Sequence, residues 1–283
     1  MANIRSLDPS ASPLDYYGSE LRRLREEAKL SQQQLGDILF CTASLIGQIE
    51  TAKKVPTRRF SEQLDNALMT GGQFTRLIGL VLRSQLPNWF QPYADMEARA
   101  TYICAFQSDV VYGLLQTPEY AREVLGARRD GDDLENTIAA RLERQRIMDR
   151  DTPPMVWVIM SEAVLCQEVG GAKVMRDQLA HLLEMQRREW VKIQILPFSA
   201  GVHAGIAGSF NVLRFEDDPD IVYTEDFVQG RMTADPSAVR EGVRRYDHLR
   251  AASLSLKESA ELIARVMEER YGDRSGPGGG MLA

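Results

Sequence analysis

Residues 31–50 have the sequence SQQQLGDILFCTASLIGQIE, and this stretch decides the fold of the N-terminal region. The hydroxyl of Ser31 can accept a hydrogen bond from an otherwise unpaired backbone amide at a helix start, and Gln34 completes a capping-box pattern with it. Thr42 can cap a second helix in the same way. The stretch therefore predicts two short helices joined by a tight turn, at residues 32–40 and 43–51.

Apolar residues recur at helical spacing in both predicted helices. They are Leu35, Ile38 and Leu39 in the first helix, and Ile46 and Ile49 in the second. Gly36 has no side chain, which lets a second helix cross closely at that point. The opposite face of the second helix is formed by Ala43, Ser44, Gly47 and Gln48. We therefore expect a tight crossing that turns a small, polar face outward.

The flanking residues predict three more helices by the same spacing. Their helical stripes, apolar apart from Arg25, contain Leu21, Leu24, Arg25 and Ala28; Phe60, Leu64, Ala67 and Leu68; and Phe74, Leu77, Ile78, Val81 and Leu82. Pro56 stops the second helix of the central pair and resets the chain. Basic residues surround this proline, namely Lys53, Lys54, Arg58 and Arg59. Five short helices in about eighty residues predict one compact helical unit.

The spacing of caps, apolar positions and polar face from Ser31 to Glu50 resembles the phage-repressor helix-turn-helix family, also called Cro/C1 or XRE. This resemblance implies that the helix from Ala43 lies in the major groove of DNA. It implies base contacts from Ala43, Ser44, Gly47 and Gln48, and phosphate contacts from Gln32, Thr42, Lys53 and Lys54. It also implies a structural ion pair between Arg25 and Glu50. A helical bundle without a DNA role is the alternative, but such a bundle does not require these features in this order.

Two positions depart from the usual pattern of this family. Gly47 stands where a larger polar residue is usual, and glycine inside a helix costs about 0.5–1 kcal/mol relative to alanine. Close approach to DNA is the expected gain. Ala52 stands where the family usually has a glycine, so the conformation of the turn after Glu50 is left open.

The length of 283 residues and the hydrophobic content of 44% predict two domains. We expect a flexible arm, a helix-turn-helix domain, a linker, a regulatory or interaction domain and a disordered tail, at residues 1–15, 16–84, 85–94, 95–270 and 271–283. The sequence has neither an apolar run near the length of a membrane span nor the pattern of a secretory signal. We therefore expect no membrane partner and a cytoplasmic, nucleoid-associated protein.

The net charge of −6 is unevenly distributed. Residues 1–83 contain 11 Lys and Arg against 9 Asp and Glu, a net of +2, so the remaining residues carry −8. A net of +2 is weak support for DNA binding, because only a one-sided basic surface would matter. The cysteines Cys41, Cys104 and Cys166 are widely spaced and form no CxxC pattern. We expect buried reduced thiols, no metal site and no cofactor.

Beyond Pro87, short runs of β-branched and aromatic residues alternate irregularly with helical patterns. The predicted strands are 101–106, 155–160, 191–196, 210–215 and 221–227, and the predicted helices are 118–125, 134–148, 172–190 and 236–254. The last two strands are joined by a short turn at Asp217, Asp218 and Pro219, which predicts an antiparallel hairpin. The predicted fold class is therefore α+β, with a helical N-terminal domain followed by a mixed domain with a mainly antiparallel sheet.

Four segments of this region resemble the C-terminal domain of a large actinobacterial family of helix-turn-helix regulators. They are GLLQTPEYAREVL (113–125), ARLERQRIM (140–148), VGGAKVMRDQLAHLL (169–183) and ILPFSAGVHAGIAGSF (195–210). The resemblance covers about residues 95–265. It implies a role in development or specialised metabolism and a partner among small proteins encoded by neighbouring genes. Tyr112 stands where this family usually has a proline.

The segment PFSAGVHAGIAGS, residues 197–209, places Gly201, Gly205 and Gly208 around His203 between two predicted strands. A ligand or partner can approach such a backbone closely. The alternative is a demanding turn whose histidine satisfies a local hydrogen bond. No nucleophile-elbow pattern surrounds the serines of this segment, so we expect no enzyme.

Together these features predict a sequence-specific transcriptional regulator, more often a repressor in such families, that binds a double-stranded DNA operator. A homodimer is expected because one small helix-turn-helix reads too few base pairs for a unique site. We expect a small partner protein to control it through the C-terminal domain. The alternatives are a small-molecule effector in an enclosed, apolar pocket, and an antitoxin-like protein that neutralises its neighbour. The stripe Leu179, Leu182, Leu183 and Met185 leaves core packing and an oligomer interface both open.

Overall fold

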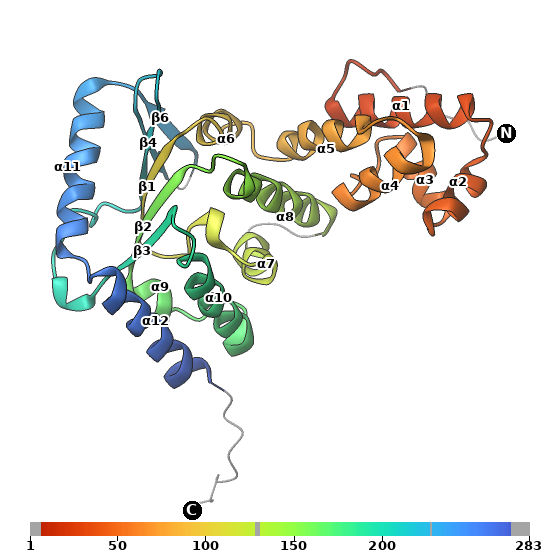
Figure 1. The fold of residues 1–283 in the computed structure, drawn as a ribbon. Helices are drawn as coiled ribbons and strands as arrows, with labels where there is room; N and C mark the ends of the chain where they lie inside the picture. Colours follow the sequence, from red (N-terminus) through yellow and green to blue (C-terminus); the bar gives the residue numbers. More distant parts are fainter. Residues whose placement is uncertain (1–6, 128–130, 227, 273–283) are drawn as a thin grey trace, which may run out of the picture. The chain divides into compact units, whose positions relative to one another are not determined.

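The computed structural model of the chain describes residues 7–127, 131–226 and 228–272. The chain divides into two compact units, whose elements are labelled in Figure 1. The first unit contains Met1–Gln91 and Gly131–Glu143, and the second contains Pro92–Asp130 and Arg144–Ala283. The first six residues of the predicted arm and the predicted tail beyond residue 272 lie outside the described residues.

Five helices form most of the first unit, which confirms the predicted helical N-terminal region. They are α1 (Pro13–Glu27), α2 (Gln32–Leu39), α3 (Ala43–Glu50), α4 (Arg58–Leu68) and α5 (Gln73–Ser84). The first four each begin after a hydroxyl residue whose side chain accepts a backbone hydrogen bond, at Ser12, Ser31, Thr42 and Thr57. The predicted caps at Ser31 and Thr42 are therefore confirmed.

Helix α5 begins in a different way, because its N-cap residue is Gly72 and provides no side-chain cap. Asp65 of α4 takes over this function: its carboxylate accepts the backbone N–H groups of Phe74 and Thr75, each at 2.8 Å. Burial raises the pKa of Asp65, but hydrogen bonds from Thr70, Thr75 and Phe74 outweigh it and hold this pKa below its usual range. Asp65 therefore joins α4 to α5 as a carboxylate.

One apolar core holds these helices together. Its fully buried members include Tyr17, Leu21, Leu35, Ile46, Leu64, Phe74 and Ile78. The prediction that Ile38 belongs to this core is wrong, since 49% of its surface is exposed. The buried residues of α2 are Leu35, Gly36 and Leu39, and a side chain at position 38 lies at the edge of this stripe that is farther from Gly36.

A segment from later in the chain completes the first unit. Helix α8 (Gly131–Gln145) contributes Gly131–Glu143, and its Ala139 packs against the core of α1–α5. The Arg58 guanidinium forms two hydrogen bonds with the Glu143 carboxylate, one of them from Nε to Oε2 at 2.9 Å. The division of the chain thus differs from the predicted continuous domain at 95–270, because these contacts join residues far apart in the sequence.

The second unit combines a six-stranded sheet with helices. Its strands are β1 (Tyr102–Gln107), β2 (Met155–Ser161), β3 (Val191–Leu196), β4 (Phe210–Arg214), β5 (Ile221–Glu225) and β6 (Gly230–Thr233). Its α-helices, apart from the end of α8, are α6 (Gln91–Glu97), α7 (Pro118–Gly126), α9 (Glu162–Cys166), α10 (Gly171–Met185), α11 (Pro236–Ala252) and α12 (Leu256–Tyr271), with α6 beginning at the boundary. Short 3-10 turns lie at Gly113–Leu115, Arg146–Asp149 and Phe198–Ala200.

The strand order is β3-β2-β1-β4-β5-β6. Strands β1, β2 and β3 pair in parallel, whereas the pairs β1–β4, β4–β5 and β5–β6 are antiparallel. The predicted mixed fold and the hairpin of β4 and β5 are confirmed. Strand β6 was not predicted, because GRMT has a single large apolar residue and lies exposed at the sheet edge.

Helix α11 covers one face of this sheet, and α7 and α10 lie on the other side (Figure 1). The face under α11 is formed by alternate strand residues, including Cys104, Phe106, Ile159 and Val212. Tyr246 and Leu249 of α11 pack on it, and the Tyr246 hydroxyl donates to the backbone oxygen of Trp157 at 2.7 Å. This contact fixes α11 to the centre of the sheet.

A buried polar cluster lies between α6 and the sheet. Glu97 has no exposed surface, and its Oε1 accepts hydrogen bonds from the hydroxyls of Tyr93 at 2.9 Å and Tyr112 at 2.7 Å. Its Oε2 lies 2.8 Å from Nε of Arg144. At position 112, where the resemblance implied a proline, the tyrosine hydroxyl thus donates to the buried carboxylate, a hydrogen bond that proline cannot form.

Three remaining expectations concern α10, the cysteines and membranes. Leu179, Leu182 and Met185 are buried, which favours core packing over an oligomer interface for the α10 stripe.

All three cysteines are free, but only Cys104 is buried, and burial raises the pKa of its thiol to about 12. Among the residues described, no helix combines the length and the apolar character needed to cross a bilayer.

Candidate nucleic-acid interface

Helix α2 begins with a two-sided cap and ends in a tight turn that leads to α3. The Ser31 hydroxyl accepts a hydrogen bond from the backbone N–H of Gln34 at 3.1 Å. In return, Oε1 of Gln34 accepts one from the backbone N–H of Ser31 at 2.8 Å. At the other end of α2, Phe40 adopts a left-handed conformation with φ 55°, and the Cys41 N–H donates to the Gly36 oxygen at 2.8 Å. The chain can therefore reverse within a few residues.

Gly36 allows this close approach. A Cβ atom at Gly36 would lie 2.7 Å from the Cys41 oxygen and 3.3 Å from the Ala43 nitrogen, at the start of α3. The backbone cannot move away without breaking the cap of α3. The glycine predicted to permit a tight crossing thus lies at the contact between the two helices.

Helix α3 presents two polar side chains to solvent. Ser44 and Gln48 are exposed, one turn apart, whereas Ile46 and Ile49 are buried. Ala43 and Gly47 lie beside them on the helix surface and are half-buried. The four residues predicted to contact bases therefore share the outward side of α3, which is narrow and low because only two of them have side chains larger than a methyl group.

Gly47 lies under the side chain of Gln32. A Cβ atom at Gly47 would be 3.3 Å from Oε1 of Gln32. Gln32 also donates from Nε2 to Oε2 of Glu50 at 2.8 Å, which uses one of its two amide hydrogens. Gln32 thus bridges the start of α2 and the end of α3, and it retains one amide hydrogen for a further acceptor.

Glu50 is the fixed point at the end of α3. It has no exposed surface and receives hydrogen bonds from Nε of Arg25 at 2.5 Å and from Nη2 of Arg25 at 3.1 Å. Arg22 lies on the same face of α1, with its Nε 3.7 Å from Oε2 of Glu50. Sequence reasoning included Arg25 but missed Arg22, although its place one turn before Arg25 is the spacing that puts both on one face.

The other three predicted phosphate contacts lie at the two ends of α3. The Thr42 hydroxyl accepts from the Leu45 N–H at 3.2 Å and is exposed at the start of the helix. Lys53 is exposed and Lys54 half-buried in the turn after the helix. Ala52 adopts φ 54° in this turn, a left-handed conformation that costs a residue other than glycine about 1 kcal/mol. The conformation of this turn, which the sequence did not predict, is therefore one that glycine favours.

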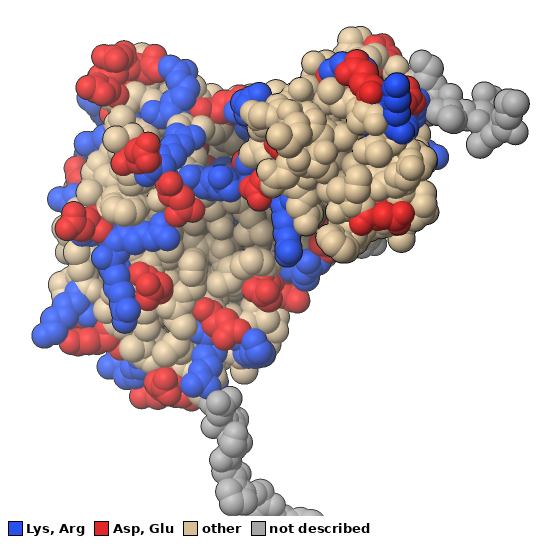
Figure 2. All heavy atoms as spheres, turned by 45° about the vertical axis from the view of Figure 1, so that its right-hand side comes forward, with Lys and Arg blue, Asp and Glu red and all other residues tan. Residues whose placement is uncertain are grey.

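Charge gives little support for this interface, since residues 1–83 carry a net charge of only +2. On the face of the chain in view in Figure 2, Lys and Arg side chains are interspersed with Asp and Glu side chains. The arrangement can recognise DNA through the shape and hydrogen-bonding groups of α3, with individual cations at its edge.

The glycine-rich segment of the second unit is a compact loop. His203 accepts the Gly205 N–H at its Nδ1 atom, 3.2 Å away, and its ring contacts that of Phe106. A Cβ atom at Gly205 would lie 2.3 Å from the Phe106 ring. Gly201 and Gly208 have positive φ values of 61° and 113°. These contacts account for His203 and the glycines as parts of a demanding turn.

The same loop exposes apolar side chains. Phe198, Val202 and Ile206 are 62%, 87% and 71% exposed. Ser209, at the end of the loop, is hydrogen-bonded to Ser108 at 3.0 Å between their hydroxyls. In the described part of the chain, no group of three or more His, Cys, Asp or Glu residues could hold a metal ion.

Comparison with known families gives two matches. A family model described as a helix-turn-helix domain matches residues 17–77. A second, described as a domain of unknown function (DUF5753), matches residues 90–265. No curated protein and no solved structure matches the chain.

Proposed function

Because the chain belongs to the DUF5753 family and carries a helix-turn-helix DNA-binding domain before that region, we propose that it is a sequence-specific transcriptional regulator. One observation carries this proposal: α3 turns Ser44 and Gln48 outward while Glu50 at its end is fixed by Arg25. A helix that is held rigidly and presents small polar groups is suited to the major groove.

Within this proposal, α3 reads bases and its flanks position the protein. Gln48 can form two hydrogen bonds with an adenine edge, and Ser44 can contact a base or a phosphate. Gln32, Thr42, Lys53 and Lys54 surround α3 at positions suited to phosphate oxygens. The resemblance of this motif to the Cro/C1 family supports the arrangement.

We further propose that the regulator acts as a homodimer and, like most members of such families, as a repressor. Two copies would read two half-sites about one helical turn of DNA apart, which gives enough base pairs for a unique operator. The burial of the α10 stripe removes one candidate surface for such a dimer.

A small protein encoded by a neighbouring gene is the proposed controlling partner. The exposed side chains of Phe198, Val202 and Ile206 support this role for the second unit, because neighbouring large apolar groups on a surface are typical of protein contacts. An antitoxin-like function, in which the chain neutralises this neighbour, uses the same surface.

The test is a mobility-shift titration of the purified chain on the DNA upstream of its own gene, across a salt series, with and without the neighbouring protein. We expect a complex that survives competitor DNA and weakens as salt rises. Equal binding to competitor and upstream DNA would contradict sequence-specific recognition. An unchanged complex in the presence of the neighbour would contradict control by that partner.

A further inference from the structure

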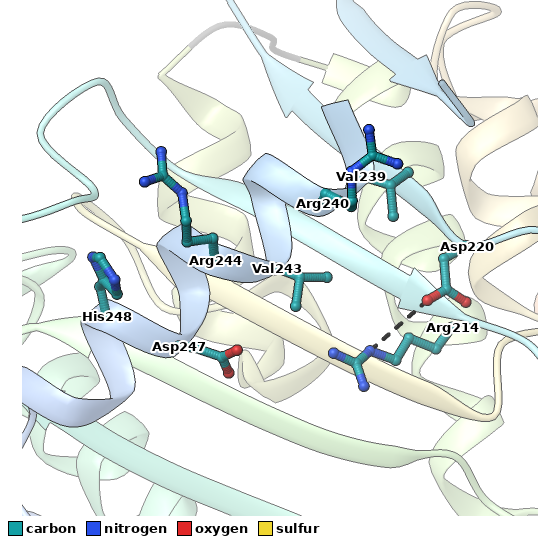
Figure 3. A pocket seen from close by; sticks show the side chains of 8 residues that line it. All are labelled: Arg214, Asp220, Val239, Arg240, Val243, Arg244, Asp247 and His248. Atoms are coloured by element: carbon teal, nitrogen blue, oxygen red, sulfur yellow. Dashed lines mark ion pairs between the residues drawn. The ribbon is translucent and has the colours of Figure 1, made fainter. Parts of the chain in front are cut away.

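An open pocket of about 680 Å³ lies on the second unit between strand β4, the connection from β4 to β5, and helix α11. Figure 3 shows its lining residues, which include Arg214 at the end of β4, Asp220 before β5, and Val243 and Asp247 on α11. Its volume lies within the range of about 300–1,000 Å³ that is usual for small-molecule sites. The effector pocket expected from the sequence was enclosed and apolar, whereas this one is open and lined by charged residues.

Arg214 is the central group of this pocket. Its side chain extends from β4 towards the side of α11 that carries Val243 (Figure 3). The guanidinium carbon lies 5.7 Å from the centre of the Tyr102 ring, which supports it from the sheet side. The nearest carboxylate oxygen, Oδ2 of Asp220, is 4.0 Å from Nε, which is too far for a hydrogen bond.

The hydrogen-bonding capacity of Arg214 is therefore unused within the described protein. Its Nε atom is buried without a hydrogen-bond partner, while 43% of the side chain is exposed. A guanidinium presents its N–H groups in a planar fork that matches a carboxylate. Tyr102 and Asp220 flank this fork, and within the described residues no hydrogen bond occupies its Nη groups.

The charges of the lining define the charge of that ligand. Three arginines, Arg214, Arg240 and Arg244, oppose two aspartates, Asp220 and Asp247, which leaves one net positive charge. Glu241 forms an ion pair with Arg244 at 2.6 Å and another with Arg245 at 2.7 Å. The charges of Glu241 and Arg245 cancel, so including both leaves the net charge around the pocket unchanged. A carboxylate neutralises one charge. A phosphate monoester, with a charge of about −1.5 to −2, would place excess negative charge beside two aspartates.

The apolar part of the lining defines the rest of the ligand. Val239 and Val243 are one helical turn apart on α11, and both are half-buried. Their side chains offer a short aliphatic surface next to Arg214 (Figure 3). A molecule with a carboxylate at one end and a short hydrocarbon chain at the other can contact both surfaces at once.

We propose that this pocket is a binding site for a small aliphatic carboxylate, with Arg214 as the residue that binds the carboxylate group. Arg240 lies at the pocket edge and adds attraction at longer range. The site is independent of the DNA-binding proposal, since every residue named for it lies in the second unit. Failure of one proposal therefore leaves the other standing.

The test uses the full chain and two probes of matched shape, 3-methylbutanoate and its neutral amide, in calorimetric titration and ligand-observed NMR. A series of straight-chain carboxylates from two to eight carbons covers other lengths, and inorganic phosphate tests the alternative anion. We expect saturable binding of at least one carboxylate, with its amide at least about ten-fold weaker. Three results would overturn the proposal: no saturable carboxylate, equal binding of the amide, or tighter binding of phosphate than of every carboxylate.

Variants connect this binding to Arg214. Arg214→Gln should weaken the carboxylate by about ten- to a hundred-fold, since a hydrogen bond to a charged group is lost. Arg187→Gln is the matched control, because Arg187 is exposed elsewhere on the second unit and should leave binding unchanged. Arg240→Gln, at an exposed position of α11, should weaken binding less and keeps the test valid if Arg214→Gln fails to fold. Unchanged binding in a folded Arg214→Gln variant would contradict the assignment. If Arg214→Gln does not fold, unchanged binding in Arg240→Gln would contradict it instead.

Discussion

The Arg25 guanidinium meets the Glu50 carboxylate through two hydrogen bonds, at 2.5 Å and 3.1 Å, and Glu50 is fully buried. Arg25 belongs to α1 and Glu50 ends α3, so this pair fixes the axis of the proposed recognition helix to the body of the unit. Its energetic value lies in the partnership, because removing one partner leaves the other charge largely buried with weaker compensation.

Glu50→Gln should therefore destabilise the first unit by about 3 kcal/mol, since the variant removes the buried carboxylate that accepts two hydrogen bonds from Arg25. The measurement is urea unfolding monitored by circular dichroism. Arg23→Ala is the matched control: it removes ion pairs with Glu20 and Glu27 on the exposed side of α1 and should cost less than about 1 kcal/mol. Equal losses in the two variants would show that the buried pair does not hold α3.

Gln48→Ala should relax operator preference. The variant removes an amide that can distinguish adenine from other bases, so discrimination at one base pair should fall by about 1–3 kcal/mol. Binding to a library of operator variants measures this directly. Asn66→Ala, at an exposed position of α4, should leave the preference unchanged. A uniform loss of affinity across the library would instead assign Gln48 to a phosphate.

Lys53→Ala should change the salt dependence of DNA binding without changing its sequence preference. Each phosphate contact releases condensed counterions, so the slope of log affinity against log salt should become shallower by about 0.9. Lys257→Ala, which alters an exposed lysine of α12, serves as the control in the same salt series. A shift in preferred sequence for Lys53→Ala would contradict the division between positioning and reading.

Asp65→Asn should lower stability at neutral pH by about 1 kcal/mol, because the carboxylate that caps α5 is lost. The pKa of Asp65 is lowered in the folded chain, so its contribution is present above the unfolded value of about 3.9 and is lost as pH falls through the folded value. Urea unfolding between pH 7 and pH 2 should therefore show the two proteins converging below about pH 4.

Glu62→Gln provides the reference for that series, since it neutralises an exposed carboxylate on the same helix. Its stability should stay within about 0.5 kcal/mol of the parent at neutral pH. A constant difference between Asp65→Asn and the parent at every pH would exclude the charged cap.

The sequence predicted the features that depend on residues close together along the chain. The caps at Ser31 and Thr42 act within three residues, and the buried positions Ile46 and Ile49 follow from helical spacing. The exposure of Ile38 was not predicted, because periodicity gives the width of an apolar stripe less reliably than its existence.

Features that depend on contacts between distant segments were outside the reach of sequence. Asp65 caps a helix that starts eight residues later, and Glu97 meets Arg144 across 47 residues of chain. Arg214 belongs to a correctly predicted strand, yet its pocket exists only because α11 packs beside β4. No local pattern reports such a juxtaposition.

The first unit is discontinuous in the chain, since Gly131–Glu143 belongs to it although 39 residues, Pro92–Asp130, separate this segment from Gln91. A fragment that ends at residue 91 would lack the covering of its core by Ala139 and the partner of Arg58. A single genetic crossover near residue 91 would therefore separate the N-terminal helices from the part of α8 that completes their unit. A crossover after Glu143 would keep the unit intact but would also transfer Pro92–Asp130 of the second unit.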